Sequence, residues 1–276
     1  MALYEATYVP KWYTKASRVI VKTAYGFESS PLARASHHSI VPNEVAILAQ
    51  IEHPCIHKLL GIDSSAEHQQ VPYMIFEPLS QLTLDLFLIQ PRTSFLDRVR
   101  VLQDIASALT YLHEHKNGSI AHGNICPPSI YILPDGRAKL THFTCAFQYI
   151  SGNPSSSAQR PEAASSTATA AHPSFYRSPE SRTTPDSESG LVFPTLAGDV
   201  WGFGAVMLRS FSALFGEMDS QDDVLRLGAD NSPLDLPGVT ANCDPRTLAM
   251  LQSTLTLDPF NRPSISTVLS DLSTLG

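Results

Sequence analysis

Apolar and polar positions form short runs in the first third of the chain and then recur with helical spacing. The run SRVIVKT at 17–23 is short and β-branched, which is typical of a strand, and VPYMIFEPL at 71–79 predicts a second buried strand. Between them, a helix is predicted from Pro42, because proline suits a first helical position. Its apolar face would comprise Val45, Ile47, Leu48 and Ile51.

The strongest helical pattern extends from Leu96 to His115, with apolar residues three and four positions apart. Two short strands are predicted next, at 129–133 and 138–143, joined by a Pro-Asp-Gly turn. A further helix begins near Asp199, and two more flank the turn DPFNRPS. Because strands come first and helices follow, we expect an α+β chain with a smaller sheet-bearing part and a larger helical part.

Residues 151–174 differ in composition from the rest of the chain. They are dominated by Ser, Ala, Thr and Pro and contain no aromatic residue. Such a segment cannot bury enough apolar area to offset the entropy of ordering. We therefore predict a flexible loop there.

Composition narrows the class of partner. The chain has 276 residues, 43% of them hydrophobic, enough for the core of one bilobal domain or two small ones. The formal charge of −7 argues against nucleic acid or an anionic membrane as partner. Four widely spaced cysteines without a CxxC pair favour a reducing compartment, and neither a leader nor a spanning segment is indicated. The expected location is the cytoplasm or nucleus.

A series of short motifs resembles the eukaryotic protein kinase domain over nearly the whole chain. In chain order these are VIVK ending at Lys22, Glu44, HPCI at 53–56, HGNICPPSI at 122–130, THFT at 141–144, SPE at 178–180, DVWGFG at 199–204 and NRP at 261–263. Each motif is weak alone, but their order and spacing make the resemblance specific. It implies a bilobal fold with residues 1–79 as the smaller lobe and hinge and 80–276 as the helical lobe, in which 151–174 corresponds to the activation loop.

The resemblance fails at the positions that perform phosphoryl transfer. The family's catalytic-loop motif HRDLxxxN supplies a base Asp and a metal-binding Asn, and these places read Asn124 and Ser129. The DFG place reads His142-Phe143-Thr144, and the loop arginine is Gly123. A neutral imidazole is a poor Mg²⁺ ligand, so we interpret His142 as a polar residue lining an unused cleft rather than a zinc ligand. No catalytic residue and no metal site are predicted.

The expected nucleotide pocket is altered but recognisable. By resemblance, Lys22 and Glu44 form the phosphate-binding pair, and the hinge offers main-chain groups of Glu77 and Leu79 after a Phe76 gatekeeper. Two positions would crowd the adenine: Ile20 replaces an alanine and Tyr131 a floor leucine. Residues 5–8, Glu-Ala-Thr-Tyr, are expected where the glycine-rich loop would wrap phosphate. No cofactor is required, and any ATP binding would be weak and independent of Mg²⁺.

The scaffold positions of the family are retained. Glu180 and Arg262 match its buried ion pair. The apolar spine would comprise Leu48, Leu59, His122 and Phe143, anchored on Asp199. Random decay would be expected to affect scaffold and catalytic positions alike, so the pattern favours a selected non-catalytic role.

Three functions remain open from the sequence. The favoured one is a pseudokinase that acts as an interaction or regulatory module on a protein partner, an active kinase or another enzyme. The second is an active Ser/Thr or dual-specificity kinase with atypical motifs, in which Asp135 or Glu77 would have to supply a metal carboxylate. The third is a nucleotide sensor that binds ATP without metal through Lys22 and the hinge.

Overall fold

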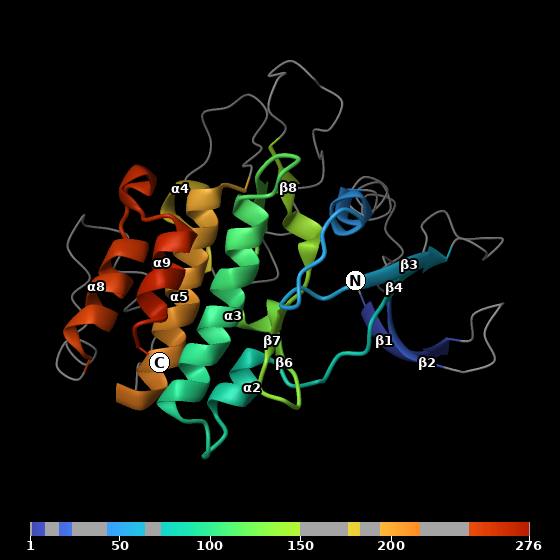
Figure 1. Cartoon of the computed structure of the whole chain (residues 1–276), viewed down its shortest axis with the longest axis horizontal. Helices are drawn as coiled ribbons and strands as arrows, with labels where there is room; N and C mark the ends of the chain where they lie inside the picture. The colour runs from blue at the N-terminus through green and yellow to red at the C-terminus, as the bar shows by residue number, and fades with distance from the viewer. Residues whose placement is uncertain are drawn as a thin grey trace.

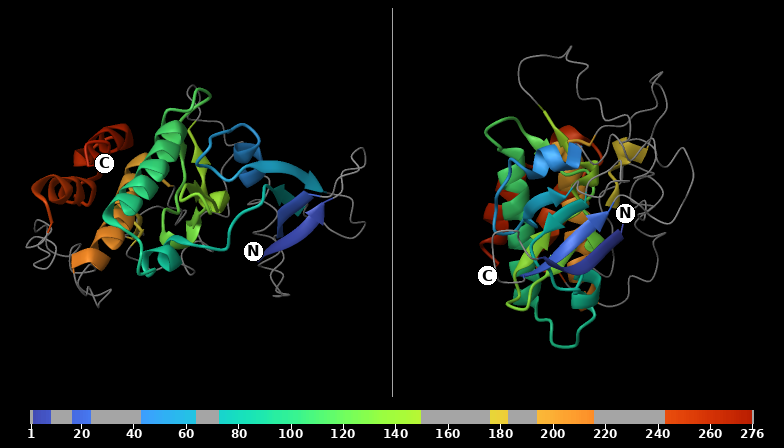
Figure 2. Two further views of the ribbon diagram at one scale, coloured as in Figure 1. Left: turned by 60° about the horizontal axis from the view of Figure 1, so that its bottom comes forward. Right: turned by 90° about the vertical axis from the view of Figure 1, so that its right-hand side faces the viewer.

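A computed structural model gives the fold, in which a β-sheet lies at one end and a group of helices at the other (Figures 1 and 2). It describes residues 2–8, 17–23, 43–63, 73–149, 176–182, 194–215 and 243–275. The segment 151–174, predicted to be a flexible loop, lies outside the described residues, as does Pro42.

The sheet contains four antiparallel strands in the order β1-β2-β4-β3. These are β1 (Ala2–Tyr8), β2 (Ser17–Thr23), β3 (Leu59–Asp63) and β4 (Tyr73–Phe76). Both strands predicted from the sequence are present, and β2 has the predicted bounds. The register places Lys22 opposite Met74 and Ile20 opposite Phe76.

The expectation for residues 5–8 is wrong. They belong to β1, which pairs with β2 at seven consecutive positions from Ala2↔Thr23 to Tyr8↔Ser17. Their main-chain groups are therefore part of a strand rather than of a loop over the cleft.

The predicted helix after Pro42 is present, with residues 43–48 helical. It is followed by α2 (Leu84–Leu88) and by the long α3 (Phe95–His113). Helix α3 begins at a capping box, in which the Ser94 hydroxyl accepts a hydrogen bond from the Asp97 N–H and the Asp97 carboxylate accepts from the Ser94 N–H. Its apolar stripe is fully buried at Leu102, Ile105 and Leu109.

Two small hairpin-like pairs lie between the sheet and the helices. The predicted strands after α3 are β6 (Ile130–Ile132) and β7 (Ala138–Leu140), and a second pair joins β5 (Ile120–Ala121) to β8 (Phe147–Gln148). The turn between β6 and β7 contains Gly136 at φ 83°, a left-handed conformation that glycine adopts without strain. Single 3₁₀ turns span Pro127–Ser129 and Phe143–Cys145.

Four described helices lie in the C-terminal part of the chain. They are α4 (Pro179–Arg182), α5 (Leu196–Phe215), α8 (Pro245–Thr254) and α9 (Ile265–Leu272), with a 3₁₀ turn at Pro259–Asn261. Helix α3 lies against both α5 and α9, as both views of the ribbon show (Figures 1 and 2). Trp201, Phe203 and Phe211 of α5 fill this core. The predicted helices after Asp199 are all present.

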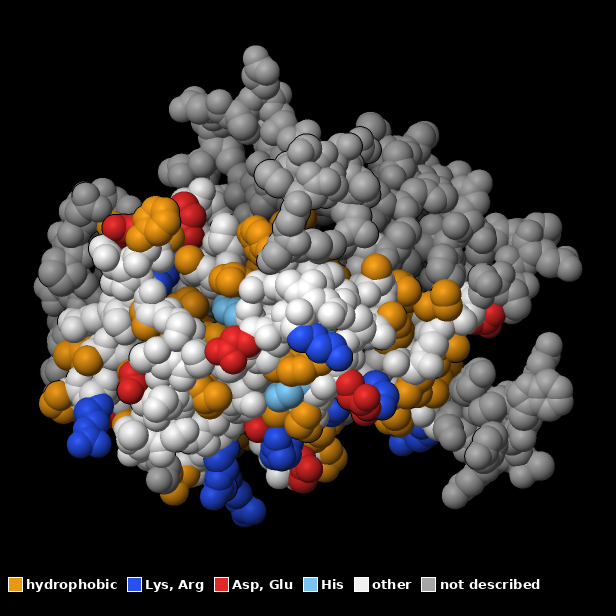
Figure 3. Space-filling model, turned by 45° about the horizontal axis from the view of Figure 1, so that its top comes forward, with side chains coloured by type: hydrophobic (Ala, Val, Ile, Leu, Met, Phe, Trp, Pro, Cys, Tyr) orange, Lys and Arg blue, Asp and Glu red, His pale blue; other side chains and the backbone are white. Residues whose placement is uncertain are grey.

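The described surface carries both signs of charge. On the face in Figure 3, Lys and Arg side chains are interspersed with Asp and Glu. No helix among the described residues is long and apolar enough to cross a lipid bilayer.

Candidate functional site

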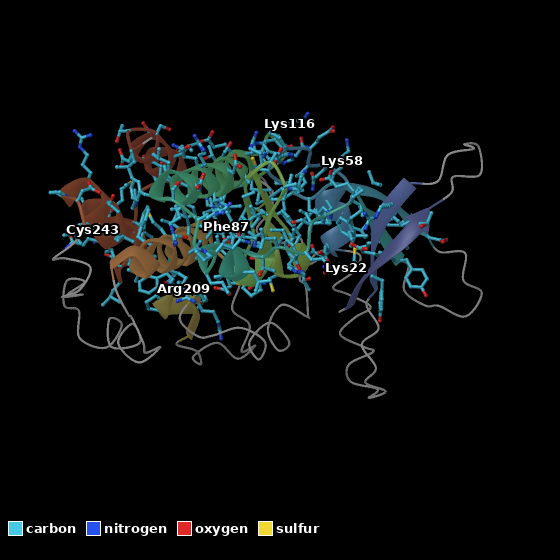
Figure 4. The ribbon with its side chains drawn as sticks, turned by 90° about the horizontal axis from the view of Figure 1, so that it is seen from below. Lys22, Lys58, Phe87, Lys116, Arg209 and Cys243 are labelled. Atoms are coloured by element: carbon cyan, nitrogen blue, oxygen red, sulfur yellow. The ribbon has the colours of Figure 1, made fainter. Side chains whose placement is uncertain are left out.

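A buried ion pair joins the sheet to the first helix. Lys22 Nζ of β2 lies 2.5 Å from Glu44 Oε1, and their side chains are 3% and 1% exposed. Lys22 Nζ also donates to Thr144 Oγ1 at 3.2 Å, and that hydroxyl donates to Glu44 Oε2 at 3.4 Å. The predicted pair is thus formed, and Thr144, at the place of the DFG glycine, is a third member that the sequence did not single out. Figure 4 shows Lys22 at the end of the sheet-bearing part that faces the helices.

A small cavity lies beside this pair. Its volume of about 10 Å³ is the space of roughly one water molecule. The lining residues are Lys22, Glu44, Leu48, His57, Phe76, Leu79, Thr141, His142 and Phe143. The cavity therefore brings together four predicted site residues: Lys22, Glu44, Leu79 and His142.

Ile20 and Tyr131 do not line this cavity. Ile20 is buried in the sheet core opposite Phe76, and Tyr131 lies on β6 with its ring centroid 6.3 Å from that of His142. Burial raises the pKa of the Tyr131 hydroxyl. Their predicted effect on adenine binding stays a prediction.

The hinge residue Glu77 is bonded through its main chain and its side chain. Its N–H donates to the Lys58 carbonyl at 3.1 Å, and its carbonyl accepts from His57 Nε2 at 2.9 Å. Its Oε1 accepts from the Lys58 N–H and from Lys139 Nζ, at 3.0 and 2.5 Å. The carboxylate is therefore directed to β7 and is not available as a metal ligand in the cleft.

Asp135, the other carboxylate considered for metal binding, is also placed elsewhere. It lies in the β6–β7 turn, where its Oδ1 accepts from the Arg137 N–H at 3.1 Å. A kinase with rerouted carboxylates would need another source for its metal ligands.

Ser129 serves the catalytic-loop backbone. Its side chain is fully buried, and its Oγ lies 2.8 Å from the Asn124 carbonyl and 2.7 Å from that of Cys126. It also accepts from the Cys126 N–H at 3.2 Å. These contacts hold the loop in a tight turn and leave the hydroxyl no direction towards the cleft.

His142 keeps an unusual backbone conformation at the DFG place. With φ 63° and ψ 56° it is left-handed, and it is the one described non-glycine residue with positive φ. That conformation costs an ordinary residue about 1–2 kcal/mol.

Gly123 occupies a place that no side chain can enter without rearrangement. Its φ is 74°, and a Cβ there would lie 2.7 Å from Pro194 carbon atoms and 2.8 Å from the Cys145 carbonyl oxygen. The family's loop arginine could not be introduced here with the backbone as it stands.

Asp199 of α5 holds the main chain at the catalytic-loop place through hydrogen bonds. Its two carboxylate oxygens accept from the main-chain N–H groups of His122 and Gly123, at 2.7 and 2.8 Å, and from His113 Nε2 at 3.0 Å. The His122 ring lies edge-on to Phe143 with centroids 4.7 Å apart, and burial lowers the pKa of His122. The predicted anchor and the contact between two spine residues are present.

The donor set does not fit magnesium. At the family's two metal-ligand positions the side chains are the Ser129 hydroxyl, which is bonded to main-chain carbonyls, and the His142 imidazole, whereas Mg²⁺ prefers carboxylate and phosphate oxygens. The Lys22–Glu44 pair, expected to bind phosphate, is formed. The phosphate side of the expected site therefore keeps its residues, whereas the metal side does not.

Comparison with known proteins extends the resemblance to the whole chain. Residues 2–272 match the family model described as protein tyrosine and serine/threonine kinase. This match confirms the expected kinase-like α+β fold, and the sheet and helices of the structure are consistent with it.

Three similar proteins come from plants. Cysteine-rich receptor-like protein kinase 6 of Arabidopsis thaliana is 25% identical over 243 residues, which are 82% of this chain and 33% of that protein. L-type lectin-domain containing receptor kinase V.5 of the same plant is 28% identical over 170 residues, 60% of this chain and 23% of that protein. U-box domain-containing protein 70 of Oryza sativa subsp. japonica is 27% identical over 201 residues, 70% and 22% respectively. The chain spans a third or less of the length of each.

Proposed function

The chain belongs to the protein tyrosine and serine/threonine kinase family, and from that premise we propose that it is a pseudokinase. In this proposal it does not transfer phosphate and acts as an interaction or regulatory module. Its partner is a protein, an active kinase or another enzyme, in the reducing environment of the cytoplasm or nucleus.

One observation carries the proposal. The hydroxyl of Ser129, at the place of the second metal ligand, is buried and bonded to the carbonyls of Asn124 and Cys126. Asn124 itself stands at the place of the base, and an amide cannot accept the substrate proton as a carboxylate does. Together with His142, the site supplies neither a general base nor an oxygen ligand set for Mg²⁺.

The scaffold supports a selected role for the inactive domain. The Lys22–Glu44 pair, the Asp199 anchor and the Glu180–Arg262 pair are all formed. Each of these requires a specific side chain, so the fold is held by the family's own contacts while its chemistry is replaced.

A phosphotransfer assay tests the proposal. The purified chain is incubated with radiolabelled ATP and Mg²⁺ or Mn²⁺, alone and with a generic protein substrate, beside the Lys22→Ala variant and an active kinase. We expect no incorporation above the level of Lys22→Ala. Incorporation by the wild type that Lys22→Ala abolishes would establish an active kinase and contradict the proposal.

A second candidate is a nucleotide sensor that works without metal. It is favoured by the intact Lys22–Glu44 pair, to which Thr144 adds a hydroxyl. Thermal shift with ATP, with and without Mg²⁺, separates the two candidates. A shift that Mg²⁺ does not change and that is lost in a Lys22→Ala variant that remains folded favours the sensor, and no shift favours the pure interaction module.

A further inference from the structure

The imidazole of His57 is hydrogen-bonded to the main-chain carbonyl of the hinge residue Glu77. His57 Nε2 lies 2.9 Å from the Glu77 carbonyl oxygen, and its ring is stacked on Phe76 with centroids 4.7 Å apart and an interplanar angle of 18°. His57 is 4% exposed and lines the small cavity together with Leu79. Because a carbonyl oxygen only accepts, the bond requires the proton on Nε2.

This arrangement uses the features by which a hinge would hold adenine. Adenine presents a 6-amino donor next to a ring acceptor, and the matching groups on this chain would be the Glu77 carbonyl and the Leu79 N–H. Here the imidazole supplies the donor for the carbonyl and the flat ring for the stack. It thus takes the place of the base by the same chemistry.

We propose that His57 is an internal cap of the cleft, which occupies the Glu77 carbonyl and the adjoining ring space and so excludes adenine nucleosides. The inference deepens the proposed function, on which it rests, by naming the group that closes the site. It also predicts that the wild type does not discriminate between purines, because the capped carbonyl gives no advantage to a ligand with a 6-amino group.

The cap is held from several sides. Glu77 is fixed to β7 through Lys139 and to the start of β3 through both the carbonyl and the N–H of Lys58. Its carbonyl therefore cannot turn away without breaking these contacts. Burial lowers the pKa of His57 to about 4, so the ring is neutral at physiological pH and does not leave by becoming charged.

A carbonyl oxygen has two lone pairs and is able to accept from a second donor. A carbonyl shared between His57 and adenine differs measurably from a carbonyl that His57 closes to every ligand. If the second lone pair served adenine, the wild type would already prefer adenosine to purine riboside, which has the same ring and sugar without the 6-amino group. If the cap excludes both, it has no such preference.

The experiment measures binding of adenosine and purine riboside to the full chain by ligand-observed NMR or calorimetry. Neither ligand carries phosphate, so the result is independent of Lys22 and of metal. For the wild type we expect equal, weak binding or none. A preference for adenosine of about tenfold, the size of one well-made buried hydrogen bond, would overturn the proposal without any variant.

Two variants separate the ring from the hydrogen bond. His57→Val removes both and is expected to bind adenosine at least about tenfold more tightly than the wild type and than it binds purine riboside. His57→Phe keeps the stacked ring but lacks the donor, and is expected to exclude both ligands as the wild type does. If a folded His57→Val binds adenosine no better than the wild type, the cleft is closed by something else and the proposal is wrong.

The outcome is distinguishable from that of the proposed function. Phosphotransfer by the wild type would contradict the pseudokinase assignment whatever the nucleoside data. Wild-type preference for adenosine without phosphotransfer would contradict only the cap. His57→Val should gain binding but no phosphotransfer, because binding energy at the base leaves the chemical barrier unchanged.

Discussion

Arg262 donates one hydrogen bond to each carboxylate oxygen of Glu180, at 2.7 and 2.8 Å, with the arginine side chain fully buried. The same guanidinium also bonds the carbonyls of Thr256, Leu257 and Ala197 and lies over the Trp201 ring. Burial alone would raise the pKa of Glu180, but the bonds and charge of Arg262 outweigh it and hold that pKa below its ordinary value. The pair thus ties α4 to the turn before α9 and to the start of α5.

We predict that this pair is asymmetric. Glu180→Ala leaves the buried guanidinium of Arg262 without its carboxylate partner and should lower the free energy of unfolding by about 3–5 kcal/mol. Arg262→Ala should cost more, since three carbonyls lose their donor as well. The double variant should cost less than the sum of the two, as measured by urea unfolding. Equal, additive and sub-kilocalorie effects would show that the contact has no energetic role.

A second prediction concerns Lys22 in the inactive protein. Lys22→Met leaves the Glu44 carboxylate buried with only Thr144 as partner, and should destabilise the fold by about 3–5 kcal/mol. The matched control is the exposed pair of Lys58 and Glu52, in which Lys58→Met should change the free energy of unfolding little, because water screens the pair. Thermal and urea unfolding of both variants give the comparison. Similar small losses in both would mean that Lys22 is retained for binding and not for the fold.

A third prediction tests the closed space at Gly123. Gly123→Ala imposes both a left-handed alanine and a contact of 2.7 Å with Pro194. Gly136→Ala imposes the same backbone strain at φ 83° with nothing within 4 Å. The control should lose about 1–2 kcal/mol, and Gly123→Ala clearly more, in the same unfolding assay. Equal losses would show that Pro194 moves aside freely, which would make the site able to accept an arginine.

Local sequence patterns predicted most of the fold because the strongest signals are periodic and short-range. The β-branched run of β2 and the three-four spacing of α3 each specify an element without knowledge of its partners. Residues 5–8 carry a weaker signal: the resemblance places them at a phosphate-binding loop, although they pair with β2 at every position. Pairing between strands is a tertiary property, which a single segment does not reveal.

Site residues that stand at motif positions were predictable from the sequence. Site residues that matter only through a contact in the folded structure were not. Lys22, Glu44 and Asp199 follow from motif positions, and their partners agree with them. Thr144 and His57 were missed, because each acts through a neighbour distant in sequence: Lys22 for the first and Glu77 for the second. The signal for His57 was a polar ring directly after the apolar Ile56 and just before the strand β3.

The last prediction is a pH dependence that originates at His57. Its folded pKa is lowered to about 4 by burial, which outweighs its contacts with Glu77, and the charges of Lys139 and Lys22 act in the same direction as burial. The unfolded chain binds this proton near pH 6.5, so between those values the unfolded state holds more protons and stability rises with pH.

Stability from this group is therefore complete above about pH 6.5 and is lost as the pH falls towards 4, by up to about 3 kcal/mol. Phenylalanine keeps the stack on Phe76 and does not titrate, so urea unfolding of His57→Phe at pH 7 and at pH 4.5 should show a smaller loss than the wild type. The pKa of His122 is also lowered by burial, but this residue is present in both proteins and cancels in the difference. Identical pH profiles for the two proteins would mean that the imidazole is solvated and charged in the native state. In that case it could not be the neutral donor that caps the Glu77 carbonyl.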